Sequence, residues 1–185
     1  MLFLALVHYP TVNKEGRTVT TSVTNFDIHD ISRAARTYGV TSYFIITPVE
    51  LQQQFTRRIM NHWLEGSGGL YNPSRKEALE GVDIASDLAE AGDVIFGKHG
   101  RHPVWIATSA KKYPNSINCG QLKSKLENDP EQPICLVFGT GYGLHPQIIE
   151  LADHILEPIR GRDGWNHLSV RSAVSIYLDR LLAST

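Results

Sequence analysis

The segment ILEPIRGRDGWNHLSVRSAVSIYLDRLL occupies residues 155–182 and combines a short apolar strand, a loop with two glycines and an amphipathic helix. We expect the strand over residues 154–159 and the helix over 168–182, where apolar residues recur at helical spacing. Gly161 and Gly164 allow the intervening backbone conformations that other residues adopt only at a cost. This strand–loop–helix unit predicts an α/β fold with a ligand-binding loop behind the strand.

A second glycine-rich loop lies shortly before it, in LVFGTGYGL, residues 136–144. An apolar strand here breaks into Gly139, Gly141 and Gly143, which would let the backbone approach a ligand closely. A plain tight turn explains the same pattern, and so does a dinucleotide site, because Glu157 follows about twenty residues on. That fingerprint normally opens its domain, however, and the helix expected over 145–152 is short.

The rest of the chain alternates strands with helices. We expect strands over 2–8, 42–47, 103–107 and 134–138, helices over 27–38, 49–63 and 73–90, and a loop at 66–69. Asn25 or Asp27 is available to cap the first helix. The alternation predicts a mostly parallel sheet flanked by helices, in one domain over residues 1–185. Ligands bind at the carboxyl ends of such strands, which here are Ala107, Phe138 and Ile159.

Composition excludes several classes of protein. The 185 residues carry a net charge of −1, so RNA binding would have to come from a local basic patch. Residues 1–7 are too short to span a membrane and lack a signal peptide's basic start, which favours a cytoplasmic protein without membrane contact. Two cysteines, Cys119 and Cys135, make no disulfide framework, and Cys135 is expected in the core. His99 and His102 have no further ligand nearby, so no metal is expected.

The two late motifs resemble those of the SPOUT family of RNA methyltransferases. Its third motif is a strand ending in Ile-Pro-Met, a glycine, and Ser-Leu-Asn-Val-Ser at the start of the last helix. Residues 157–159 and Gly161 are similar to the first half, and residues 167–171 to the second, with Ser169 where many members have asparagine. Phe138-Gly139 and Gly143-Leu144 match the second motif, but Gly141 stands where the ribose-methylating branch has glutamate.

An earlier segment, DIHDISRAARTYGV at residues 27–40, resembles the family's first motif. Arg33 falls on the family's arginine, whereas Asp27 and His29 replace the usual asparagine and glycine. The resemblance therefore covers roughly residues 20–48 and 103–182, and it implies a deep C-terminal trefoil knot and a homodimer acting on RNA without a metal.

The resemblance also implies that S-adenosylmethionine (SAM) lies bent in the knot, held by backbone groups of three loops, and leaves as S-adenosylhomocysteine. The residues expected to bind it are Thr108, Ser109, Ala110, Phe138, Gly139, Thr140, Gly141, Gly143, Leu144, Pro158, Ile159, Gly161, Asn166, His167, Leu168 and Val170.

Methyl transfer requires alignment of nucleophile and methyl group, and control of one proton. Arg33, Asp163 and Ser169 are the catalytic candidates. Arg33 would stabilise a ribose 2′-alkoxide, and Asp163 would serve as a base for guanine N1, in a tRNA or rRNA. Substrate-binding candidates are Arg36, Arg75 and Arg171. Because Arg171 lies unfavourably for its charge at a helix start, it suggests an anionic partner. Two alternatives stay open: an NAD(P)-binding oxidoreductase and a catalytically inactive RNA-binding module with the same fold.

Overall fold

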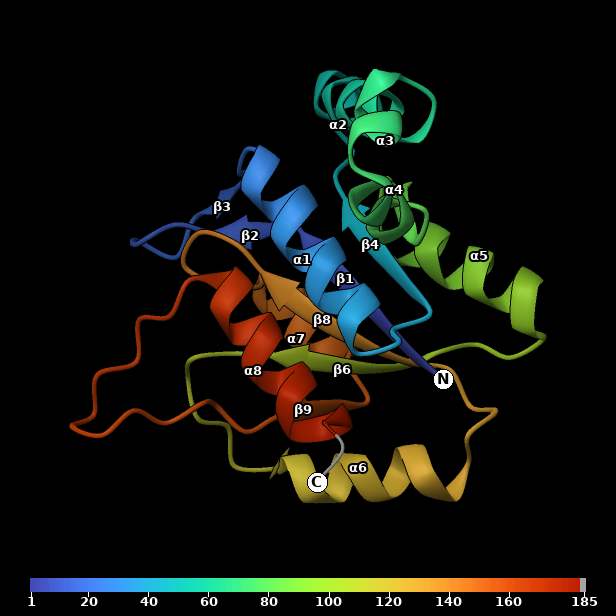
Figure 1. Cartoon of the computed structure of the whole chain (residues 1–185). Helices are drawn as coiled ribbons and strands as arrows, with labels where there is room; N and C mark the ends of the chain where they lie inside the picture. Colours follow the sequence, from blue (N-terminus) through green and yellow to red (C-terminus); the bar gives the residue numbers. More distant parts are fainter. Residues whose placement is uncertain (184–185) are drawn as a thin grey trace.

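The computed structural model describes residues 1–183; the last two residues of the expected domain, Ser184 and Thr185, lie outside the described residues. Its main sheet has seven strands in the order β5-β4-β1-β8-β6-β9-β7, and every pair is parallel (Figure 1). The strands are β1 (Leu2–Val7), β4 (Ser42–Ile46), β5 (Val82–Ala85), β6 (Val104–Thr108), β7 (Ser116–Ile117), β8 (Ile134–Gly139) and β9 (His154–Leu156). The expected parallel sheet is confirmed.

Helices cover both faces of this sheet, and a short hairpin lies beside it (Figure 1). The helices are α1 (Asn25–Thr37), α2 (Glu50–Leu64), α3 (Ser67–Tyr71), α4 (Pro73–Leu79), α5 (Leu88–His99), α6 (Cys119–Asn128), α7 (Pro146–Leu151) and α8 (Val170–Leu182). The hairpin consists of β2 (Thr11–Val12) and β3 (Thr18–Val19). Within the described residues, no helix has the length and apolar character needed to cross a membrane.

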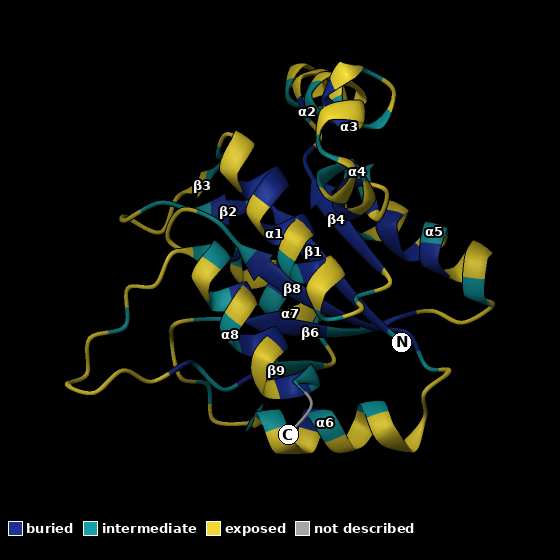
Figure 2. Cartoon of the chain, viewed as in Figure 1, coloured by how far each residue is buried: buried dark blue, intermediate teal, exposed yellow. Residues whose placement is uncertain are grey.

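The core lies in two layers that the central strand β1 separates. Its alternating side chains point to opposite faces: Leu2, Leu4 and Leu6 join α1, α6 and α8, whereas Phe3, Ala5 and Val7 join α5 and α7. Figure 2 shows β1, β4 and β8 as buried and the outer sides of the helices as exposed. Burial on both faces explains why these strands are continuous apolar runs rather than alternating ones.

The helix expected over residues 73–90 was wrong. Helix α4 ends at Leu79, Gly81 follows, and Val82–Ala85 form strand β5 beside β4. A new helix, α5, then begins after Asp87, whose carboxylate accepts a hydrogen bond from the Glu90 N–H at 2.8 Å. The four-residue segment VDIA is compatible with either a helix or an edge strand, so its hydrophobic pattern could not distinguish the two structures.

The loop expected at residues 66–69 was also wrong in part, because α3 begins at Ser67. A Cβ at Gly69 would lie 2.2 Å from the backbone oxygen of Trp63, so glycine is needed for α3 to pack on the end of α2. The cap of α1 differs as well. Thr24, not Asn25 or Asp27, is the N-cap, and Asp27 completes a capping box with it.

Candidate active site

The three loops expected to bind SAM follow neighbouring strands. In the order β8-β6-β9, the ends of these strands meet at one edge of the sheet. The Thr108 hydroxyl donates to the Val137 carbonyl at 2.9 Å, which ties the end of β6 to β8. The Asn166 side-chain amide donates to the Ala110 carbonyl at 2.9 Å. The first and third loops are therefore in direct contact.

Backbone geometry determines the second loop, residues 139–144. Gly141 and Gly143 have φ of 62° and 115°, in the region that favours glycine. A Cβ at Gly139 would lie 2.5 Å from the Leu144 backbone nitrogen. Two backbone hydrogen bonds, from Tyr142 to Val12 and from Val12 to Gly143, fasten the loop to β2. These hydrogen bonds and close contacts determine the backbone path of the loop at the end of β8.

The third loop, residues 157–169, is more open. Ile159 is buried, whereas Asp163, Leu168 and most neighbouring residues are exposed. A Cβ at Gly161 would lie 2.4 Å from the Trp165 carbonyl oxygen, so this turn also requires glycine. Ser169 is the N-cap of α8, and its hydroxyl accepts a hydrogen bond from the Ser172 N–H at 3.2 Å. Its predicted catalytic role therefore competes with capping.

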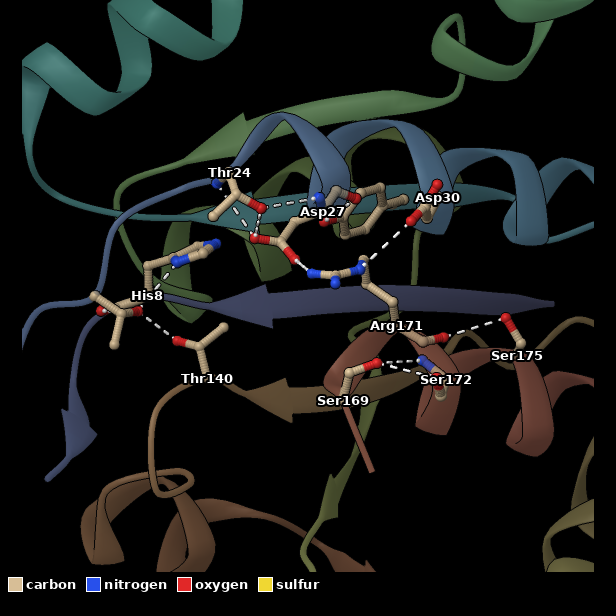
Figure 3. A network of polar contacts seen from close by, with 11 residues as sticks. His8, Thr24, Asp27, Asp30, Thr140, Ser169, Arg171, Ser172 and Ser175 are labelled. Carbon is tan, nitrogen blue, oxygen red and sulfur yellow. Dashed lines mark hydrogen bonds and ion pairs between the residues drawn. The ribbon is translucent and has the colours of Figure 1, made fainter. Parts of the chain in front are cut away.

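An ion-pair network joins the first and third motifs (Figure 3). Arg171 Nη1 donates to Asp27 Oδ1 at 3.0 Å, and Arg171 Nε lies 3.4 Å from Asp30 Oδ2. The Asp27 side chain is only 6% exposed, and the Thr24 hydroxyl also donates to it at 2.6 Å. The anionic partner expected for Arg171 is thus present inside the chain, and it attaches α8 to α1.

Sequence reasoning missed His8, which follows β1 and lies beside the same network (Figure 3). Its ring is fully buried, and its Nδ1 lies 3.1 Å from the Thr21 hydroxyl, which in turn contacts the Thr140 hydroxyl. Burial lowers the pKa of His8 to about 4, against a smaller opposing effect of Asp27, so the ring is neutral at pH 7. A histidine directly after an apolar strand was the available signal.

Three other candidate arginines, two from the first motif and one from α4, lie elsewhere. Arg33, Arg36 and Arg75 line a cleft of about 340 Å³ between α1 and α4, together with Asn72 and Ser74. Arg36 pairs with Glu77, whereas Arg33 is exposed and forms no ion pair within residues 1–183. Arg33 follows the start of α1 by eight residues, or about 12 Å along the helix axis. The lining of this cleft includes no residue of the three loops expected to bind SAM.

The two histidines considered for a metal pack against aromatic rings. His102 stacks on Phe96 with ring centroids 4.4 Å apart, and the edge of His99 meets Phe3 at 5.4 Å. In the part of the chain that the structure describes, no group of three or more His, Cys, Asp or Glu side chains is placed to hold a metal ion.

A family model described as SAM-dependent RNA methyltransferase matches residues 1–183. The chain belongs to this family. The match includes all three segments that resemble the SPOUT motifs. As a member of this family, the protein uses SAM and acts on RNA. The resemblance to SPOUT proteins is confirmed.

Two relatives and one solved structure illustrate the range of similar proteins. An uncharacterized protein of Aquifex aeolicus is 41% identical over 98% of this chain and 88% of its own length. A tRNA (guanine-N(1)-)-methyltransferase of Nitratidesulfovibrio vulgaris is 44% identical, but the chain spans only 42% of that protein. The SpoU methyltransferase AviRb of Streptomyces viridochromogenes, solved with AdoMet, has a TM-score of 0.57 at 14% identity, covering 98% of this chain and 56% of AviRb.

The topology also disfavours the dinucleotide alternative. In that fold the acidic residue ends the strand next to the glycine loop. Here β9, which precedes Glu157, pairs with β6 and β7 and not with β8. The Glu157 carbonyl instead accepts a hydrogen bond from the Tyr177 hydroxyl at 2.7 Å. The methyltransferase assignment and the strand order therefore agree.

Proposed function

We propose that this methyltransferase modifies a ribose 2′-hydroxyl of a tRNA, as a cytoplasmic homodimer of one SPOUT-type domain over residues 1–185. The observation that carries the proposal is Arg33, an exposed guanidinium of the first motif without a carboxylate partner in the described chain. A permanently charged donor of this kind stabilises the negative charge that develops on the attacking oxygen.

The residues at the edge formed by the ends of β6, β8 and β9 fit SAM. The loops at residues 108–110, 139–144 and 158–170 follow three neighbouring strands, and a Cβ at Gly139 or Gly161 would lie 2.5 Å or 2.4 Å from backbone atoms, so these two positions require glycine. When bound, SAM supplies a methyl group on a sulfonium with a good leaving group. The chain would hold the donor by backbone contacts of these loops.

Because Arg33 lines a cleft between α1 and α4 that includes no residue of the loop edge, we propose that Arg33 of the partner subunit completes each site. The 2′-hydroxyl then lies between that guanidinium and the methyl group. Asp163, in the loop before α8, and Ser169, the N-cap of α8, are both exposed and would face the same ribose. A homodimer with two-fold symmetry forms two such sites.

A C-terminal trefoil knot is the finer part of the fold proposal. Strand β9 pairs with β6 and β7, after which the chain passes residues 157–169 and returns to pack α8 against α1. This return path across the carboxyl edge supports threading of the last helix through the preceding loop. A crystal structure with SAM tests the knot, the loops and the dimer together.

Guanine N1 is the second candidate target, and one observation favours it. The relative from Nitratidesulfovibrio vulgaris carries that activity in its name, although more than half of its length has no counterpart here. Removing the N1 proton requires a base, and Asp163 in the third loop is the carboxylate available. Mass analysis of nucleosides from tRNA treated with enzyme and SAM distinguishes a 2′-O-methyl ribose from a base-methylated guanosine.

The shared-site proposal predicts complementation between two inactive variants. In a heterodimer of Arg33→Ala and Gly139→Val subunits, one site combines intact SAM loops with an intact Arg33 of the partner. Random mixing should restore about a quarter of wild-type methyl transfer, because half of the dimers carry one functional site of two. The measurement is transfer of labelled methyl from SAM to tRNA.

Each variant alone supplies the control for this experiment. Arg33→Ala alone should keep SAM affinity by calorimetry but lose roughly 99% of turnover, as removal of one charge-stabilising donor costs about a hundredfold. Mixtures as inactive as the separate variants would place Arg33 and the loops in one subunit. A normal turnover of Arg33→Ala would end its catalytic assignment altogether.

A further inference from the structure

A second cleft lies between α1, α2 and α4, on the helical layer that stands beyond β4 in Figure 1. Its volume is about 480 Å³, within the range of small-ligand sites. We name it the α2 cleft. The residues that line it are Asn25, His29, Phe55, Arg58, Ile59, His62, Trp63 and Arg75. Arg75 was expected to bind substrate, but no local pattern predicted the cleft itself, because three separate helices contribute its residues.

The charge of the α2 cleft is positive. Arg58 and Arg75 line it, and none of its lining residues is acidic. Neither arginine forms an ion pair with any carboxylate in residues 1–183. The Arg75 guanidinium instead lies over the Trp63 ring, 4.6 Å from its centroid, which fixes its plane at the cleft. Two uncompensated guanidinium groups are suited to a phosphate.

Two buried polar atoms at this cleft have no hydrogen-bond partner within the described chain: His29 Nδ1 and Arg75 Nε. His29 is only 8% exposed, and the edge of its ring meets Trp63 with centroids 5.5 Å apart. Buried polar atoms in native proteins are nearly always paired, so each of these two atoms calls for a partner that a ligand or a water molecule can supply. Burial, with help from Arg75, lowers the pKa of His29, which leaves a neutral imidazole able to contact an uncharged base edge.

The cleft also offers an exposed aromatic surface. Phe55, on the outer side of α2, is 46% exposed although it is a large apolar residue. Single-stranded nucleic acids stack their bases on such rings while basic side chains follow their phosphates. Phe55, the arginine pair and the unpaired His29 nitrogen thus supply the separate contacts that a nucleotide needs.

We propose that the α2 cleft binds one unpaired nucleotide of the RNA substrate, adjacent to the nucleotide that is methylated. Its base stacks on Phe55 and meets His29, and its phosphate lies between Arg58 and Arg75. The adjacency rests on the proposed function, because Arg75 also lines the neighbouring cleft that contains Arg33. The RNA is thereby recognised by a single-stranded step beside its target.

A pair of neighbouring arginines on α2 gives a matched test. Both arginines are exposed, but Arg58 lines the cleft, whereas Arg57 lies outside it and donates to Gln53 at 3.1 Å. Binding of a fluorescein-labelled single-stranded decaribonucleotide gives the readout. Arg58→Ala should weaken this binding about fivefold and reduce the slope of log affinity against log salt concentration by about one. Arg57→Ala, with the same loss of charge, should change it less than twofold. Equal effects of both variants would overturn the proposal.

Stacking is tested at Phe55 with a conservative control. Phe55→Leu should weaken binding of the same decaribonucleotide about tenfold, since base–aromatic stacking is lost, and Phe55→Tyr should restore it. An unchanged affinity of Phe55→Leu overturns the assignment. Binding of GMP as tight as that of the decaribonucleotide would also overturn it, in favour of a free-nucleotide site.

Calorimetry with SAM separates this proposal from the proposed function. All α2-cleft variants should bind SAM as the wild type does, because the loops at the carboxyl edge are unchanged. Normal methylation of tRNA by Arg58→Ala and Phe55→Leu at low substrate concentration would remove the cleft from RNA recognition and leave the methyltransferase assignment intact. If Arg33→Ala loses the 2′-O-methyl product and the cleft variants keep it, the result bears on the role of Arg33 in methyl transfer and not on nucleotide binding at the cleft.

Discussion

The loop edge, residues 108–110, 139–144 and 158–170, differs from the surroundings of α1 in what holds it together. At the loop edge, backbone groups and glycines determine the shape, as at Gly139 and Gly161. Around α1, side chains do so, through the buried Asp27–Arg171 pair and the cleft at Arg75. The comparison predicts that donor binding depends on positions that require glycine, whereas RNA recognition depends on the identity of side chains.

The largest expected effect tests the backbone part of this comparison. In Gly139→Val, the new Cβ would lie only 2.5 Å from the Leu144 backbone nitrogen, so the loop must move to accommodate the side chain. We expect no measurable SAM binding by calorimetry. Gly97→Val is the matched control, because nothing lies within 4 Å of its ideal Cβ position. If Gly139→Val remains folded and binds SAM normally, the donor site is elsewhere.

The next effect concerns acid stability. The pKa of His8 is about 4 when folded and 6.5 when free, so the unfolded state binds the proton more readily between these values. Stability should therefore fall as pH decreases from about 6.5 to about 4, by roughly 3 kcal/mol from this group. Urea unfolding at pH 7.5 and 4.5 measures it, and His8→Asn should show a smaller loss. Equal losses in both proteins would contradict the burial of a neutral ring.

A smaller effect separates the two roles of Arg171. Arg171→Ala removes the guanidinium that pairs with the Asp27 carboxylate, which is 6% exposed and keeps only the hydrogen bond from the Thr24 hydroxyl. We therefore expect the free energy of unfolding to fall by about 2 kcal/mol. Arg101→Ala removes an exposed pair with Asp129 and should cost less than about 1 kcal/mol. An unchanged urea midpoint together with weaker RNA binding would instead assign Arg171 to the substrate, as its position at the helix start first indicated.

The smallest effect sharpens the picture of the loop edge. Asn166→Ala removes the hydrogen bond to the Ala110 carbonyl but no backbone group that would face SAM. We expect about fivefold weaker SAM binding, the value of one ordinary hydrogen bond. Calorimetry on the variant and on Asn118→Ala, which loses a helix cap remote in sequence, gives the comparison. A loss as large as that of Gly139→Val would mean that side chains govern this edge too.

What the sequence could predict follows the same division. The loops after β8 and β9 were predicted because glycine and proline mark a backbone requirement directly in the sequence, and the loop after β6 because it follows a strand of the same parallel sheet. The α2 cleft was not, because His29, Phe55 and Arg75 come from three helices whose packing no local pattern encodes. Residues 82–85 were missed as a strand for a related reason: an edge strand needs only a partner, here β4, to form.

The position of β1 has a consequence for synthesis on the ribosome. Leu2–Val7 pair with β4 on one side and with β8 on the other, so the second partner is made more than 120 residues later. At ordinary elongation rates this delay is on the order of ten seconds. During that time one edge of a wholly apolar strand has no neighbour, and an unpaired apolar strand edge is a site at which nascent chains can aggregate.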